Sequence, residues 1–129
     1  MSACGAHMVV VDGLAGERGG RSCFLALQDV DYIDADGHYM AIHVGNRLYT
    51  GRDSLKRLVR ALEPYGFVQI SSSRIVNVQR VQYAEKGRRG VPAFVLLDGT
   101  RLVFGPGYYI AAGAELRVKK RRRARKLLE

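Results

Sequence analysis

From residue 21 onward, apolar and polar positions alternate along the first half of the chain, a spacing typical of half-buried β-strands. The pattern predicts four strands, over residues 22–27, 30–35, 38–44 and 47–50. Asp36-Gly37 and Gly45-Asn46 separate the last three, and such pairs are strong turn signals. Because the connections are short, we expect an antiparallel meander.

Residues 53–62 carry the one clear helical pattern, because their apolar side chains recur at i, i+3, i+4 and i+7. We expect Asp53 to cap the first turn, and Pro64 with Gly66 to end the helix. The basic side chains of this segment lie on the face opposite the apolar one: Lys56, Arg57 and Arg60.

The second half of the chain returns to strand-like spacing. It predicts strands over residues 67–70, 76–85, 92–97 and 101–104. A basic loop at 86–90 and an Asp98-Gly99 turn connect the last three. The protein is therefore expected to be mostly β, with one short helix and a second one if the C-terminal tail is helical.

The first 20 residues are small and glycine-rich, with one apolar run at Val9-Val10-Val11. They predict either one short strand followed by a turn or a partly disordered segment that precedes the fold. A phosphate-binding loop is not indicated, because no Gly-Lys-Ser/Thr follows the glycines.

Composition adds one unusual number, the net charge. The chain has 129 residues, 21 Lys and Arg against 12 Asp and Glu, and a net charge of +9, which points to a polyanionic partner. The excess is uneven: residues 116–129 hold eight basic residues and one acid, or +7, which leaves +2 for residues 1–115. The charge therefore characterises the tail more than the domain before it.

Within the tail, residues 111–129, the basic run 119–126 has few helix breakers, and Ala124, Leu127 and Leu128 favour a helix. Three interpretations remain open: nonspecific contact with nucleic acid, a solvated and disordered run of charge, or contact with an acidic membrane or protein surface. The candidate phosphate contacts in it are Lys119, Lys120, Arg121, Arg122 and Arg123.

No catalytic or metal-binding pattern is found. Cys4 and Cys23 lack the spacing of a zinc site or a disulfide framework, and His38 and His43 would point to opposite faces of a strand. The serines at 71–73 have neither a nucleophile elbow nor a neighbouring base. We expect no enzyme activity, no metal and no cofactor.

Four aspartates between residues 29 and 36 look like a carboxylate cluster, but we expect them to form turns and protect a strand edge: Asp29, Asp31, Asp34 and Asp36. No apolar stretch is long enough to span a membrane, and no signal peptide is evident. The sequence therefore predicts a cytoplasmic protein.

Four segments resemble, in order and spacing, motifs of the LytTR family, the DNA-binding output domain of bacterial LytR/AlgR-type response regulators. Residues 30–39, VDYIDADGHY, are similar to the family's I-x-Y-I-E-A-x-G-N/H-Y. The others are YTGRDSLKRL at 49–58, FVQISSSRIVN at 67–77 and DGTRL at 98–102. This resemblance divides the chain into a segment of residues 1–19, a LytTR-like domain of residues 20–110 and the basic tail.

The resemblance implies an elongated, mostly antiparallel β fold whose loops enter successive major grooves of double-stranded DNA, while flanking groups hold phosphates. His38 occupies the first base-contacting position, unless it is simply an exposed turn residue, and Arg52 is expected to hold a phosphate or a carboxylate at the start of the helix. Asn77 is expected to make structural hydrogen bonds. The DNA-binding residues expected in the domain are His38, Tyr39, Arg52, Ser71, Ser72, Ser73, Arg74, Gly105, Gly107 and Tyr108.

Two of the three loops depart from the family pattern. Ser72 stands where the family usually has Arg or Asn, and the third loop contains Pro106 in place of a polar side chain. An Arg in the major groove can bind guanine through two hydrogen bonds, which a serine and a proline cannot replace. We therefore expect altered or weaker base recognition.

The sequence favours a double-stranded DNA-binding domain that acts in transcription regulation. The alternative is a degenerate LytTR-like module that binds a protein or an anionic surface. No phosphoacceptor receiver domain is found in these residues, so a partner protein is expected to supply the signal, and a homodimer on direct repeats is a further expectation.

Overall fold

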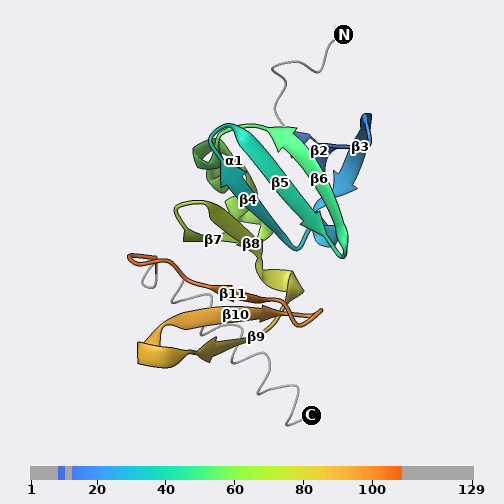
Figure 1. Ribbon diagram of the computed structural model, residues 1–129. Helices are drawn as coiled ribbons and strands as arrows, with labels where there is room; N and C mark the ends of the chain where they lie inside the picture. Colours follow the sequence, from blue (N-terminus) through green and yellow to red (C-terminus); the bar gives the residue numbers. More distant parts are fainter. Residues whose placement is uncertain (1–8, 11–12, 109–129) are drawn as a thin grey trace.

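Two antiparallel β-sheets lie one above the other along the long axis of the molecule (Figure 1). The computed structural model describes residues 9–10 and 13–108. The first sheet has the strand order β1-β2-β6-β5-β4-β8-β7, with β3 paired to β2. Its strands are β1 (Val9–Val10), β2 (Gly13–Arg18), β3 (Arg21–Ala26), β4 (Tyr32–Asp36), β5 (Tyr39–Val44), β6 (Arg47–Arg52), β7 (Phe67–Ser71) and β8 (Arg74–Asn77).

The second sheet is smaller and has the order β11-β10-β9. Its strands are β9 (Val81–Lys86), β10 (Pro92–Leu96) and β11 (Arg101–Val103). The described part of the chain also contains helix α1 (Leu55–Leu62) and four short 3-10 helices. The mostly β, elongated antiparallel fold with a short helix is thus confirmed. The predicted four-strand meander is confirmed for β4-β5-β6 but is wrong for its first strand, because β3 pairs with β2 and not with β4.

Strand β2 was not predicted, because its glycines were interpreted as turn residues. Gly13 and Gly16 instead lie in the strand, where a side chain would not fit. A Cβ on Gly13 would overlap the ring of Phe24 and lie 2.7 Å from the backbone oxygen of Leu25, and one on Gly16 would lie 2.9 Å from a methyl group of Leu25. These glycines allow close packing, a role that alternation does not reveal.

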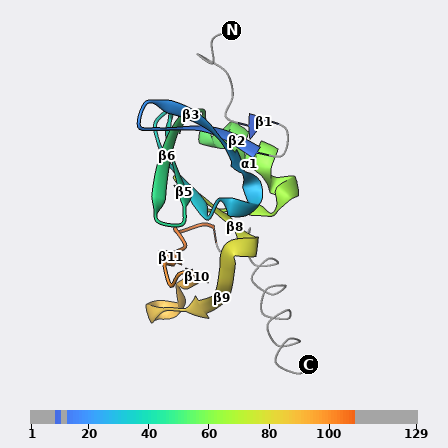
Figure 2. The same cartoon turned by 90° about the vertical axis from the view of Figure 1, so that its right-hand side faces the viewer.

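Helix α1 covers the inner face of the first sheet, which curls toward it (Figure 2). Leu58 and Leu62 are fully buried there, as the helical spacing predicted. The predicted cap is wrong by one residue: Ser54 Oγ, not Asp53, accepts the hydrogen bond from Arg57 N at 3.2 Å. The first core also contains strand residues that alternate toward the helix, among them Ile33, Met40, Ile42 and Ile75.

The single strand predicted over residues 76–85 is wrong, because the chain leaves one sheet and enters the other within it. β8 ends at Asn77, the 3-10 turn Val78–Arg80 follows, and β9 begins at Val81. Asn77 is buried, and its side-chain oxygen accepts from Gln79 N at 3.1 Å while its amide donates to the carbonyls of Leu27 and Val30. The structural role expected of Asn77 is confirmed.

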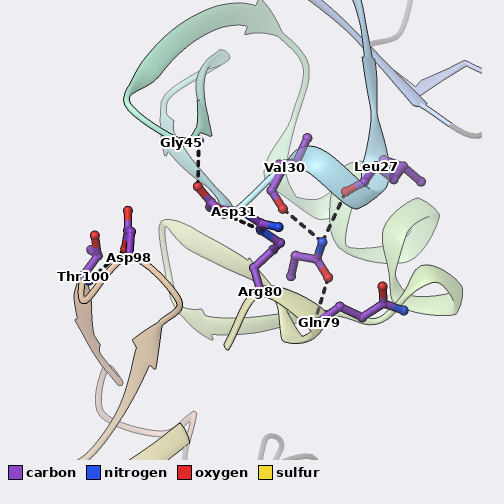
Figure 3. Close-up of polar contacts among 9 residues, drawn as sticks. Leu27, Val30, Asp31, Gly45, Gln79, Arg80, Asp98 and Thr100 are labelled. Carbon is purple, nitrogen blue, oxygen red and sulfur yellow. Dashed lines mark hydrogen bonds and ion pairs between the residues drawn. The ribbon is translucent and has the colours of Figure 1, made fainter. Parts of the chain in front are cut away.

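An ion pair lies at the same crossing (Figure 3). Arg80 Nε donates to Asp31 Oδ1 at 2.8 Å, and the other oxygen of Asp31 accepts from Gly45 N at 2.8 Å. The carbonyl of Arg80 accepts from Leu97 N, just after β10. Arg80 therefore contacts both sheets, and a second core cluster joins them through Ile70 and Val76 of the first sheet.

Replacing Asn77 by alanine is expected to lower the free energy of unfolding by about 1–3 kcal/mol, because the buried carbonyl of Val30 would lose the donor that Asn77 supplies. The carbonyl of Leu27 would keep only the hydrogen bond from Val30 N. Chemical denaturation measures the loss. Gln82→Ala, at an exposed position of β9, is the control and should change stability by less than about 0.5 kcal/mol. Equal effects of the two substitutions would contradict the assigned role.

Candidate nucleic-acid interface

The turn between β4 and β5 is a two-residue hairpin turn closed by the pair Asp36 and Tyr39. Gly37 has a φ of 64°, which glycine adopts without strain, and His38 follows it at the exposed tip. The carbonyl of His38 accepts from Asp53 N at 3.0 Å, which ties the tip to the segment before α1. The first predicted base contact is therefore solvent-exposed on a braced turn.

The turn between β7 and β8 lies next to it. Ser71 pairs with Arg74 across the turn, and Ser71 Oγ accepts from Ser73 N at 3.2 Å. The carbonyl of Ser73 accepts from Ala35 N, at the end of β4, at 2.7 Å. This hydrogen bond places the first two turns side by side, with Ser72 and Ser73 exposed.

The third turn comes from the second sheet, directly after β11. Tyr108 N donates to Gly105 O at 3.3 Å across Pro106 and Gly107, and the φ of Gly107 is 85°. Proline followed by a residue of positive φ is the pattern of a type II turn. The turn lies against the second one, because Gly105 N donates to Ile70 O at 2.7 Å.

Gly105 is packed so closely that a larger residue would not fit without movement. A Cβ there would lie 3.1 Å from the Cβ of Ser71. Tyr108 is half-buried against the second core, so part of its ring serves packing. The structure thus brings the predicted residues of three separate turns to one edge of the molecule. The predicted tail contacts, Lys119 to Arg123, lie outside the described residues.

Tyr39 and Arg52 form an exposed pair beside the first turn. They face each other across β5 and β6, with the guanidinium 4.8 Å from the ring centroid and Arg52 Nη2 donating to the tyrosine hydroxyl at 3.1 Å. The carboxylate at the start of the helix, Asp53, lies 3.5 Å from the Arg57 guanidinium. The phosphate or carboxylate contact expected of Arg52 stays a prediction. Its charge stays at the edge that carries the turns.

An open cleft of about 350 Å³ lies between α1 and the β7–β8 turn. The sequence motifs did not predict this cleft. Helical spacing did place its two cations, Lys56 and Arg60, on the polar face of the helix. Its lining residues are Leu55, Lys56, Val59, Arg60, Gln69 and Ser72.

Comparison with known proteins agrees with this arrangement. The sequence model of a family described as "LytTr DNA-binding domain" matches residues 20–111. The chain belongs to the LytTR family of DNA-binding domains. No curated protein matches the sequence.

Among solved structures, the LytTR domain of this chain is similar to the LytTr DNA-binding domain of a protein from Bacillus cereus described as a methyl-accepting/DNA response regulator. The match has a TM-score of 0.74 and 16% sequence identity, and it covers 81% of this chain and 96% of the other. At this identity the match shows the fold.

Within the LytTR domain, Arg74 does not extend from its turn as an unpaired cation. Its Nε donates to Asp34, and its guanidinium lies 5.2 Å from the ring centroid of Tyr32. His43 Nε2 lies 3.1 Å from the other oxygen of Asp34 and stacks on Tyr32 with ring centroids 4.0 Å apart. Pairing across β4, β5 and β8 places these side chains on one face of the sheet.

The turn-forming and edge-protecting role expected of the aspartates is wrong for two of them. Asp31 is buried and pairs with Arg80. Asp34 lies on a central strand, between β5 and β8, and pairs with Arg74. Sequence spacing could not identify these partners, because they lie 49 and 40 residues away in the chain.

The surroundings of Asp34 favour its charged form. Burial alone would raise the pKa of this carboxyl, but the hydrogen bonds from His43 and Arg74 outweigh burial and lower the pKa from 3.8. Burial and the nearby charge of Asp34 raise the pKa of Tyr32. The cluster is thus held together by an ionised carboxylate.

In the part of the chain that the structure describes, no group of three or more His, Cys, Asp or Glu side chains is arranged to hold a metal ion. Within those same residues, no helix is long and apolar enough to cross a membrane.

Replacing Asp34 by asparagine is expected to make unfolding less sensitive to acid. A carboxyl whose pKa is lowered by folding stabilises the protein above its unfolded pKa, and this contribution is lost as the pH falls through the folded value. The slope of unfolding free energy against pH, measured between about pH 5 and pH 2, should therefore be shallower in the variant.

Asp36→Asn removes the same charge from the same strand at an exposed position and is the control. The stabilising role assigned to the Asp34 carboxylate would be contradicted if D34N kept the slope of unfolding free energy against pH of the original chain. It would also be contradicted if D36N changed that slope as much as D34N does.

Proposed function

We propose that this LytTR domain binds double-stranded DNA with sequence preference through the three adjacent turns, and that it acts in transcription regulation. The observation that supports the proposal is the convergence of the turns. Hydrogen bonds from Ala35 to Ser73 and from Gly105 to Ile70 hold turns from both sheets at one edge. Loops held on rigid strands can contact base edges without a large ordering cost.

The exposed groups of these turns suit base contacts of modest strength. The imidazole of His38 and the hydroxyls of Ser72 and Ser73 can each make single hydrogen bonds in a major groove. None makes the double contact that arginine offers to guanine. Recognition by the turns is therefore expected to be selective but weak, and the basic tail would add contacts that are blind to sequence.

The proposed regulatory role is supported by the family, whose domains bind DNA in response regulators. We propose a cytoplasmic protein that receives its signal through a partner protein and that binds direct repeats as a homodimer. The competing hypothesis, a LytTR module that binds a protein or an anionic surface, predicts no preference between DNA sequences.

The test is a fluorescence-anisotropy titration of the full chain with random duplex DNA and with duplexes selected for binding. A second chain carries Gln in place of Lys119, Lys120, Arg121, Arg122 and Arg123. A preference for selected duplexes that survives neutralisation of the tail supports the three turns as the specific site. Binding that disappears with the tail charge, and that shows no preference beforehand, refutes sequence-specific regulation.

His38→Ala should weaken binding to the selected duplex about five- to tenfold and binding to random duplex much less, because one base contact is lost. Asn46→Ala, at the exposed turn between β5 and β6 at the other end of these strands, is the matched control and should leave both affinities unchanged. An unchanged preference in His38→Ala would show that this turn does not contact bases.

A further inference from the structure

The cleft between α1 and the β7–β8 turn borders the proposed DNA-binding edge. Ser72, at the exposed tip of the second turn, lines one side, and the polar face of α1 lines the other. Between them, the side chains of Leu55 and Val59 pack against the first core. The cleft is therefore an open surface that continues from the turns onto the helix.

Two cations line this cleft, and neither is paired in the described part of the chain. Lys56 and Arg60 are exposed, and no ion pair or hydrogen bond of either side chain is found among those residues. The neighbouring arginines Arg57 and Arg74, by contrast, each form an ion pair with a carboxylate. Arg57 pairs with Asp53, and Arg74 pairs with Asp34. The positive charge on this side of the turns is thus concentrated at the cleft.

The arrangement of donors suits a phosphate. Lys56 and Arg60 are four residues apart on α1, which places them one turn, or about 6 Å along the axis, from each other on the same face. Ser72 also lines the cleft, and its side chain carries a hydroxyl that can donate one hydrogen bond. Gln69 uses one amide hydrogen to hold Ser71 O at 3.0 Å, and the amide has a second hydrogen to donate.

We propose that this cleft binds the phosphate backbone of the DNA that the three turns contact, with Lys56 and Arg60 as the charged ligands. The inference rests on the proposed function and extends it to a surface outside the base-contacting turns. Because the cleft is open and its cations are long and exposed, it fits a continuous chain of phosphates passing across the helix better than an enclosed small molecule. Phosphate contacts of this kind set position and affinity and leave sequence preference unchanged.

The test compares Lys56→Gln and Arg60→Gln with the original chain on random and on selected duplexes at several salt concentrations. Each substitution should reduce the magnitude of the slope of log affinity against log salt by about 0.9, the value for one phosphate contact. Affinity should fall about three- to tenfold at low salt, equally for both duplexes. The same series in the tail-neutralised chain separates these contacts from those of the tail.

Arg47→Gln is the matched control, because it also removes one exposed positive charge. Arg47 lies at the end of β6 that is remote from the three turns. Its slope should equal that of the original chain. Denaturation midpoints of all variants should agree, since the substituted side chains are exposed.

Unchanged slopes for Lys56→Gln and Arg60→Gln, or a slope change equal to that of Arg47→Gln, would overturn the proposal while leaving DNA binding by the turns intact. A loss confined to the selected duplex would also overturn it, because that is the signature of a base contact. If the original chain binds neither duplex, the proposed function itself fails, and the two failures are thus distinguishable.

Discussion

The crossing between the two sheets is the constraint on which the arrangement of the molecule depends. One segment, from Asn77 to Arg80, ends the first sheet and starts the second. The side chain of Asn77 is buried and that of Arg80 is half-buried, so both need partners, and both find them on the connection between β3 and β4. Two of the three turns at the proposed DNA-binding edge belong to the first sheet and the third follows the second. The crossing therefore sets their relative positions.

Ion pairing decides which cations of the domain remain available to a polyanion. Arg57, Arg74, Arg80 and Arg101 each lie against a carboxylate, so much of their charge is compensated. Arg52 is held by a tyrosine, which leaves its charge in place while ordering its position. A nearly neutral domain can thus present positive charge locally, and its small net charge says little about its binding edge.

The sequence predicted most of the strands and the helix, because alternation and helical spacing follow directly from which face is buried. Prediction from the sequence failed where a residue had a structural role that is uncommon for its type. Gly13 and Gly16 resembled turn residues but permit close packing of strands, and Asn77 interrupted an apolar run that otherwise resembled one strand. The predicted site residues on the three turns lie together at one edge, whereas the pairing of Arg74 with Asp34 was not foreseen.

The sequence by itself determined the family and the mostly β architecture, because local periodicity, turn dipeptides and ordered motifs are all written in short segments. Only the tertiary structure decided how the charges are used. Asp31, Asp34 and their arginine partners are far apart in the chain, and Lys56 meets Ser72 only across a cleft between helix and turn. Such contacts depend on sheet order and register. Those are set by the packing of the whole core, and no local pattern encodes them.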